Sequence, residues 1–415
     1  MSHTYTLQLH TGSFVHQMHT FDEIKEKAER IIKKLKISDI ILGWNTDEKL
    51  NQQLVSYFHE KGIRVLLWLP VLSETDQLKN ITMITTVNGT QGERVNVIEH
   101  ESFSFSCPGT QQNIDHVISI YEEYFSDIPF DGVFIDKIRF PSFANGYEEG
   151  FGCFCQSCQE KLTGVDLDEI KLLIHNHDHS LLAGQYDKEG IYHFDHQEVD
   201  AFYKQRANII TDYIIALTTY FSSRHLIVGA DIYAPFLAYH VGQNTKKISE
   251  VVDFIKPMMY RYTEAPAGMR YEYQAYVQHF DDSKCFRDYW DDDPASDESI
   301  KKQLEFLSNL PTHVFPGIEI NPIDGICSTD QSKLKQNLEL FKDYSIISLC
   351  WDLMQMDETY QQTQEEIAEN ANSEPFVVAE SEVIETGSEV VEPQPEKVAG
   401  EVVENDESVP DFMKD

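Results

Sequence analysis

The segment from Phe130 to Pro141 places two carboxylates and an arginine around an apolar stretch. The apolar residues Gly132–Ile135 predict a buried strand that ends at Asp136, and Arg139 follows three residues later. A guanidinium near Asp136 would favour the ionised carboxylate, which suits a nucleophile or an electrostatic stabiliser better than a proton donor. The alternative is a structural pair in which Arg139 and Asp136 brace the loop.

A second group of reactive side chains is the C-x-C-x2-C cluster of Cys153, Cys155 and Cys158. Three thiolates this close together can wrap one metal ion, and tetrahedral Zn²⁺ then needs a fourth ligand. Cys107 is our candidate, and a closed site of four thiolates indicates structural zinc, because catalytic zinc keeps one position open. The alternatives are reduced cysteines without a metal, or a fourth ligand from one of five histidines: His175, His177, His179, His193 or His196.

The elements that must position these residues alternate along the chain. Short β-rich apolar runs occur at 5–9, 40–42, 63–69, 132–135, 226–230, 254–259, 314–318 and 346–350. Helical stretches with apolar residues at i, i+3 and i+4 lie between them, at 21–36, 47–61, 111–125, 199–223 and 330–344. Eight strands alternating with helices predict an α/β fold, a (β/α)8 barrel; a doubly wound sheet is the alternative, but no Gly-rich dinucleotide turn is present.

Barrel enzymes carry their active sites at the carboxyl ends of the strands. The residues at or just past the end of each predicted run include aromatic rings and carboxylates: His10, Trp44, Trp68, Asp136, Asp231, Tyr260, Glu319, Trp351 and Asp352. Aromatic faces that stack on sugar rings, with carboxylates between them, are what a carbohydrate site needs. The alternative for each aromatic residue taken alone is a place in the core.

Length and charge set the outer limits. The 415 residues carry a formal net charge of -37, which argues against nucleic acid or an anionic membrane as partner and suits a neutral or cationic small substrate. From Gln361 onward 16 Asp and Glu face two Lys, so we predict a barrel domain over 1–372 and a disordered acidic tail over 373–415, available to a protein partner. Residues 139–198 form an insertion after the fourth strand, expected to cap the rim and shape the pocket.

The compartment follows from three further features of the sequence. No apolar run approaches the ~20 residues that span a bilayer. The N-terminal residues lack the basic start and apolar stretch of a signal peptide. Seven cysteines, with three crowded together, favour reduced thiols or metal ligands over a disulfide framework. We therefore expect a cytoplasmic protein.

Three short blocks carry a resemblance to a known group of enzymes. Residues Asp131–Pro141 resemble the fourth-strand signature of glycosidase barrels, D-G-x-x-x-D-x-x-R-x-P. Gly229–Pro235 and Asp253–Tyr260 resemble the fifth- and sixth-strand segments of the same families. The similarity extends in order from Thr4 to Met356 and implies a glycoside hydrolase whose substrate is an oligosaccharide or another glycoside.

Glycosidases use two carboxyls that flank the scissile bond, and the resemblance proposes Asp136, Asp231 and Glu319 as their source. Barrels of the β-galactosidase-like clan carry the acid/base on the fourth strand and the nucleophile on the seventh, which would make Asp136 the proton donor and Glu319 the nucleophile. That clan has Asn-Glu on the fourth strand, whereas this chain has Ile-Asp. In α-glycosidase-like barrels a fourth-strand Asp is the nucleophile, so Asp136 would attack and Asp231 or Glu319 would be the acid; Arg139 favours this assignment.

The resemblance also bears on the metal and on the remaining rim residues. A cysteine after the third strand together with C-x-C-x2-C after the fourth is similar to the structural zinc site of the β-galactosidase barrels. Arg139 and the rim residues outside the carboxylate pool are assigned to substrate binding. Two other classes of function stay open: a catalytically inactive carbohydrate-binding barrel, and a scaffold that works through its acidic tail.

Overall fold

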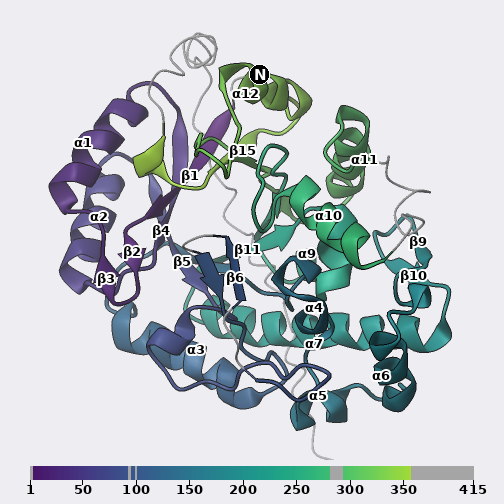
Figure 1. Ribbon diagram of the computed structural model, residues 1–415. Coiled ribbons are helices and arrows are strands. Elements are labelled where there is room, and N and C mark those ends of the chain that lie inside the picture. Colours follow the sequence, from purple (N-terminus) through teal and green to yellow (C-terminus); the bar gives the residue numbers. More distant parts are fainter. Residues whose placement is uncertain (1–2, 92–94, 99–100, 281–292, 357–415) are drawn as a thin grey trace, which may run out of the picture. The chain divides into compact units, whose positions relative to one another are not determined.

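Eight strand positions close into a parallel barrel in the computed structural model, which describes residues 3–91, 95–98, 101–280 and 293–356 (Figure 1). Around the ring they are β1 (Thr4–His10), β4 (Ile37–Gly43), β5 (Arg64–Pro70), β8 (Gly132–Asp136), β11 (Ile227–Tyr233), β12 (Phe254–Met258), β13 (His313–Val314) with β14 (Gly317–Glu319), and β15 (Ile346–Cys350). Parallel pairing of β15 with β1 completes the ring. The predicted (β/α)8 class is confirmed, and every predicted apolar run overlaps an observed strand.

The seventh strand position differs from the single run expected over 314–318. Two short strands occupy it: β13 pairs with the start of β12, while β14 pairs with the end of β12 and with β15. Pro316 lies between them and has no N–H to donate to a ladder, which explains the break. The Pro316 carbonyl still accepts a hydrogen bond from the Ser348 N–H at 2.9 Å.

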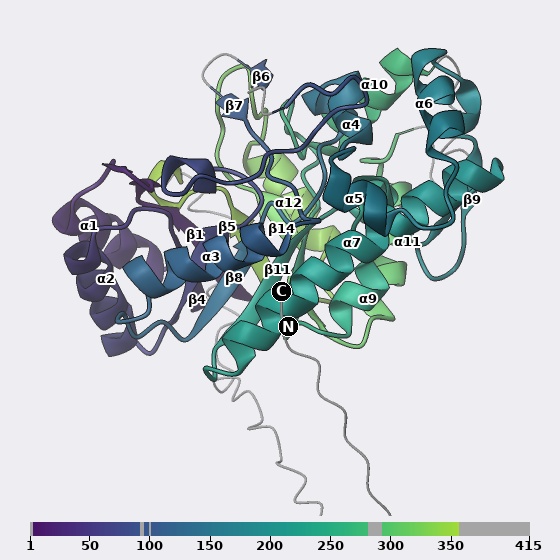
Figure 2. The ribbon, with the colours of Figure 1, turned by 90° about the horizontal axis from the view of Figure 1, so that it is seen from below.

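Helices surround the strands, and Figure 2 shows α7 running along the outside of the barrel. They include α1 (Phe21–Ile32), α2 (Glu48–Glu60), α3 (Gln111–Tyr124), α7 (Gln197–Ser222), α9 (Thr245–Ser249), α10 (Met269–His279), α11 (Asp297–Ser308) and α12 (Gln331–Leu340). Side-chain caps set several starts: Thr20 forms a capping box with Glu23 at α1, and Asp47 accepts from the Leu50 N–H at α2. No helix in the described ranges is both long and apolar enough to cross a bilayer. The end of the predicted barrel domain at residue 372 and the predicted tail over 373–415 lie outside the described residues.

Apolar side chains fill the barrel interior on the side away from the carboxyl ends of the strands. These residues form one cluster: Ile41, Leu66, Trp68, Phe134, Phe254, Phe315 and Ile346. The ring of Phe254 stacks on that of Phe315 at a centroid distance of 4.6 Å. The Phe254 ring also explains why position 229 on the neighbouring strand is a glycine, because a Cβ there would lie 2.1 Å from that ring.

Side chains of a strand alternate between its two faces, so residues two apart point the same way. Above Phe134 the next interior position of β8 is therefore Asp136. Above Gly229 on β11 it is Asp231, and above Phe254 on β12 it is Lys256. Three adjacent strands thus carry ionisable groups in one layer directly above the apolar cluster.

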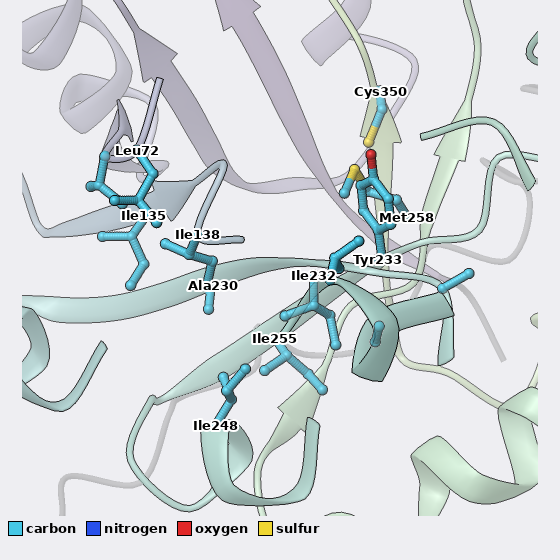
Figure 3. Close-up of a cluster of buried hydrophobic side chains, with 14 of the residues drawn as sticks. Leu72, Ile135, Ile138, Ala230, Ile232, Tyr233, Ile248, Ile255, Met258 and Cys350 are labelled. Carbon is cyan, nitrogen blue, oxygen red and sulfur yellow. The ribbon is translucent and has the colours of Figure 1, made fainter. Parts of the chain in front are cut away.

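The opposite faces of the same strands pack against the helices. Figure 3 shows Ile135 of β8, Ala230 and Ile232 of β11 and Ile255 of β12 in this outer apolar layer, with Ile248 of α9 beside Ile255. All five side chains are fully buried. This core holds the strand ends in place.

The insertion after β8 contains α4 (Tyr147–Phe151), α5 (Gln156–Lys161), α6 (Leu167–His175) and a hairpin of β9 (Gly184–Tyr186) and β10 (Tyr192–Phe194). It packs along α7, where the buried Arg206 donates to the carbonyls of Gly150 and Gly152 at 2.8 and 3.1 Å. Of residues 139–198, Arg139 lines the cavity at the strand ends and the others do not. The expectation that the insertion caps the rim and shapes the pocket therefore stays a prediction, and Arg139 is the residue through which the insertion reaches the cavity.

Candidate active site

A cavity of ≈ 320 Å³ opens at the carboxyl ends of the barrel strands, within the ~300–1,000 Å³ range of small-molecule sites. Its walls include all the residues expected at the rim except one: His10, Trp44, Trp68, Asp136, Arg139, Asp231, Tyr260, Trp351 and Asp352. The exception is Glu319. The sequence-based grouping of strand-end residues from the first to the eighth strand therefore corresponds to one physical site.

Asp136 is held as a hydrogen-bond acceptor on both oxygens. The Trp68 indole Nε1–H donates to its Oδ2 at 2.8 Å, and the Lys137 backbone N–H donates to its Oδ1. Lys137 has φ 56°, an uncommon left-handed conformation for a residue with a side chain. An ionised carboxylate only accepts hydrogen bonds, so two N–H donors match the charged form of Asp136.

Asp231 is a neighbour of Asp136 in the sheet. The register of β8 and β11 pairs Ile135 with Ala230, so Asp136 and Asp231 occupy the next positions of the two strands. Adjacent strands lie ~4.8 Å apart, and both side chains line the cavity. The two carboxyls therefore stand beside each other.

The environment of Asp231 differs sharply from that of Asp136. Its side chain is buried, and this burial raises the pKa of the Asp231 carboxyl to about 8. Lys256 opposes the increase, with its Nζ 2.9 Å from Asp231 Oδ2, whereas the nearby Asp136 carboxylate adds to it. Asp231 thus favours the protonated form at neutral pH.

Lys256 has no exposed surface and is paired with Asp231 in the register of β11 and β12. Its Nζ also donates to the Tyr260 hydroxyl at 2.9 Å. Burial alone would lower the pKa of this ammonium, but Asp231 together with neighbouring groups holds it above its ordinary value. The Asp136 carboxylate adds to this effect.

Glu319 does not reach the cavity. The backbone N–H of Tyr262, in the loop after β12, donates to Glu319 Oε1. The side chain is fully buried, and burial raises its pKa to about 7, although backbone hydrogen bonds oppose the increase. The loop after β14 contributes Ile323 and Ile326 to the cavity wall in its place.

Aromatic rings form the walls on either side. Trp44 and Trp68 meet edge to face at 5.4 Å, and His10 meets Trp44 at 4.9 Å. Tyr260 and Trp351 meet edge to face at 5.7 Å. Burial, assisted by Lys137, lowers the pKa of His10 to about 4, so its ring is neutral at pH 7.

Several buried polar atoms of this wall have no hydrogen-bond partner among the described residues: Gln8 Oε1, His10 Nε2, Trp44 Nε1 and Asp231 Oδ1. Enclosed polar atoms without partners are costly in a folded protein. Each of these atoms has almost no accessible surface, and further atoms of the same kind occur elsewhere in the described residues.

Arg139 and Asp136 do not form the ion pair that the sequence suggested. The Arg139 guanidinium packs against the rings of Phe105 and Tyr233, with its Cζ 4.7 and 4.4 Å from their centroids. Its Nη1 donates to the carbonyl of Phe140 at 3.0 Å. The interpretation as a bracing Asp–Arg pair is therefore wrong.

Asp352 lines the cavity but is also engaged in the local backbone. Its Oδ1 accepts from the backbone N–H groups of His10 at 3.2 Å and Met354 at 3.1 Å. Burial raises the pKa of the Asp352 carboxyl. These contacts tie the ends of β1 and β15 together.

Sequence reasoning missed several residues of the site. Lys256, which contacts Asp231, was read as part of an apolar strand, although a lysine inside such a run was itself a signal. Gln8, Tyr233 and Gln243 also line the cavity. Gln8 and Tyr233 lie within strands, whereas Gln243 belongs to a loop after β11 whose position depends on tertiary packing.

The four predicted cysteines lie together. The Sγ atoms of Cys107, Cys153, Cys155 and Cys158 are all within 4.8 Å of one another. Tetrahedral zinc with Zn–S bonds of about 2.3 Å separates its sulfurs by about 3.8 Å, and Cys107 Sγ lies 3.3 Å from Cys158 Sγ and 3.4 Å from Cys155 Sγ. No histidine belongs to the group, which is the one cluster able to hold a metal in the described part of the chain.

The surroundings of the sulfurs also fit thiolates. The Gly109 N–H donates to Cys107 Sγ and the Thr85 N–H to Cys153 Sγ, both at 3.3 Å. A Cβ at Gly109 would lie 2.6 Å from Cys158 Sγ. The loops after β5 and β8 therefore close around a cradle with room for the four sulfurs but not for an added methyl group.

Comparison with known proteins identifies a family and a shared fold. A family model described as "Putative glycosyl hydrolase domain" matches residues 33–278. The glycoside hydrolase domain of PgaB (BpsB) from Bordetella bronchiseptica has a TM-score of 0.54 at 12% identity, over 89% of this chain and 99% of that chain. At this identity the likeness shows the fold.

Two further solved structures are more distant. Alpha-L-fucosidase isoenzyme 2 from Paenibacillus thiaminolyticus has a TM-score of 0.48 at 15% identity, over 89% of this chain and 49% of that chain. The C-terminal domain of a "putative chitinase" from Desulfitobacterium hafniense DCB-2 has a TM-score of 0.47 at 10% identity, over 89% and 99%. No curated protein matches the sequence.

Proposed function

Because this chain belongs to the family described as "Putative glycosyl hydrolase domain", we propose that it hydrolyses a glycosidic bond in the cavity at the strand ends. The observation that carries the proposal is the pair Asp136 and Asp231. Two carboxyls in neighbouring register positions have opposite environments, one accepting N–H donors and one kept protonated by burial. Such divergence is how a pair of carboxyls divides nucleophile and acid roles.

In the proposed first step Asp231 donates its proton to the oxygen of the leaving group as the glycosidic bond breaks. Asp136 Oδ attacks the anomeric carbon, which forms a covalent glycosyl-enzyme. Asp231 is left as a carboxylate, and the Lys256 ammonium at 2.9 Å stabilises the new charge. In the second step Asp231 removes a proton from water, whose oxygen displaces Asp136 from the anomeric carbon.

The register of the two strands supports retention of configuration. Retaining enzymes hold the two carboxyls ~5–5.5 Å apart and inverting enzymes ~6.5–9.5 Å apart. Neighbouring positions on strands whose backbones lie ~4.8 Å apart favour the shorter distance. The alternative in which Glu319 is the nucleophile has no support from the cavity, because Glu319 is not part of its wall.

The walls of the cavity support a carbohydrate as substrate. Trp44 and Trp351 offer aromatic surface for sugar rings, and Gln8 and His10 line the same wall. These features come from the first, second and eighth strands, opposite the carboxylates of the fourth and fifth.

A screen of aryl α- and β-glycosides tests this proposal, with Asp136→Asn as the matched control. We expect wild-type protein to cleave at least one glycoside and Asp136→Asn to lose about 10³-fold or more in kcat, because the nucleophile is gone. Turnover that survives in Asp136→Asn would contradict the mechanism. Binding of sugars without any hydrolysis would favour an inactive carbohydrate-binding barrel.

We also propose that Cys107, Cys153, Cys155 and Cys158 hold a structural zinc ion. Bound there, zinc would supply a cross-link between two loops of the barrel rim. A site closed by four thiolates leaves no position for substrate. Its proposed role is therefore to keep the loops after β5 and β8 in place, and the backbone donors at Thr85 and Gly109 support it.

A further inference from the structure

Arg139 is a buried cation in the wall of the cavity. Its side chain is 5% exposed and lines the cavity beside Tyr233 and Gln243. Nη1 donates to the Phe140 carbonyl and to Asn145 Oδ1 at 3.3 Å, whereas Nε and Nη2 have no partner among the described residues. Neither nitrogen is among the fully enclosed atoms that lack a partner, so both keep accessible surface, which the cavity provides.

Two aromatic rings lie against this guanidinium. Its Cζ is 4.7 Å from the ring centroid of Phe105 and 4.4 Å from that of Tyr233, and Tyr233 is itself held by a hydrogen bond from its hydroxyl to Glu272 at 2.9 Å. The edge that carries Nε and Nη2 is a planar fork of N–H donors, the arrangement that binds carboxylate or phosphate oxygens in pairs.

The lysine of the cavity wall has a compensating contact. Lys137 is paired with Glu74 at 3.1 Å. Arg139 forms no direct ion pair with a carboxylate within the ranges that the structure describes, although its charge acts to lower the pKa of the nearby Asp231. A buried charge without a directly bonded counter-ion is costly, which a negatively charged ligand group would relieve.

We propose that Arg139 binds an oxyanion on the substrate, so that the site selects an acidic carbohydrate. The oxyanion is a carboxylate of an acidic sugar or a sulfate or phosphate ester, since all present paired oxygens to the fork. This proposal rests on the proposed function, because it concerns the same cavity. The net charge of -37 does not oppose it, since charges beyond ~8 Å are screened in physiological salt.

Matched pairs of sugars test the proposal without requiring turnover. Binding of D-glucuronate against D-glucose and of D-galacturonate against D-galactose is measured by titration calorimetry and saturation-transfer NMR. Glucose 6-sulfate and glucose 6-phosphate distinguish an ester from a carboxylate. We expect an acidic member to bind about tenfold or more tightly than its neutral partner, as for a charge-assisted pair of hydrogen bonds.

Variants then assign the preference to the guanidinium. Arg139→Gln is expected to bring the two members within about twofold of each other, and Arg139→Lys to retain part of the preference. Lys137→Gln is the matched control, because it removes a cavity cation that Glu74 already neutralises, and it should keep most of the preference. Circular dichroism verifies that each variant is folded.

Equal binding of both members of every pair by wild-type protein, or no binding of any acidic member, overturns the proposal even if no variant folds. An acid preference that persists in folded Arg139→Gln overturns it as well. A failure of this inference can be distinguished from a failure of the proposed function. Acid-selective binding without hydrolysis would leave this inference standing, while hydrolysis of neutral glycosides without acid preference would leave only the hydrolase.

Discussion

Lys256 Nζ lies 2.9 Å from Asp231 Oδ2 inside the barrel, and the two residues are paired across β11 and β12. Lys256 has no exposed surface and is not part of the cavity wall, whereas Asp231 is. The lysine therefore acts on the reaction only through its neighbour. It limits the rise of the Asp231 pKa caused by burial and stabilises the carboxylate that remains after proton donation.

Replacement of this lysine should change the pH profile of the enzyme. Wild-type kcat/KM is expected to fall above about pH 8, because Asp231 loses the proton that it must donate. In Lys256→Met the fall should move to higher pH, since the ammonium that favours ionised Asp231 is absent. Lys246→Met, on the exposed side of α9, is the control. A loss of rate with no shift of the alkaline limb would reduce Lys256 to a structural role.

Glu319 should affect stability rather than catalysis. Its folded-state pKa of about 7 lies above the ordinary value of 4.5. Between these pH values the folded state keeps a proton that the unfolded state releases. The contribution of Glu319 to the free energy of unfolding is therefore complete below pH 4.5 and is lost as pH rises through 7. Urea denaturation should therefore show wild-type stability falling relative to Glu319→Gln across that window. Parallel pH dependences would contradict this assignment.

The four-cysteine cluster should carry one zinc ion per chain. Elemental analysis of the purified protein is expected to show this stoichiometry, and Cys107→Ser or Cys155→Ser should reduce it while lowering Tm. Cys327→Ser, at a buried cysteine outside the cluster, should leave the zinc content unchanged. The site would be refuted if the purified protein contained no zinc and its Tm changed neither with added zinc nor with a chelator.

Gly229 should tolerate no side chain while Phe254 fills the barrel. Gly229→Ala forces a Cβ to within 2.1 Å of the Phe254 ring, and overpacking of this kind costs about 1–3 kcal/mol. Urea denaturation measures the loss in free energy of unfolding. Phe254→Leu should lessen the cost of Gly229→Ala in the double variant; additive effects would show that the two residues do not interact.

The strands were predictable because each barrel strand is a short apolar run with a clear boundary, and the parallel arrangement then placed their ends on one rim. This alone brought His10, Asp136 and Trp351, distant in sequence, into one site. Glu319 is not part of this cavity wall, and its side chain accepts a hydrogen bond from the Tyr262 N–H in the loop after β12, a contact that the sequence did not indicate.

Arg139 shows the second limit. Its spacing from Asp136 suggested an ion pair. The guanidinium instead packs against the rings of Phe105 and Tyr233, which belong to other elements. Long-range packing of this kind is not encoded in local spacing. The cysteine cluster was found because three of its members are adjacent in sequence and the barrel order brings the fourth beside them.

The most direct test of the central claim compares three variants on a glycoside that the wild-type protein cleaves. Asp136→Asn and Asp231→Asn should each lower kcat by about 10³-fold or more, while Glu319→Gln should remain within about tenfold of wild type. This result would identify the pair in the fourth and fifth strands as nucleophile and acid. Full activity of either Asp variant, or a loss in Glu319→Gln as large as in Asp136→Asn, would contradict the account.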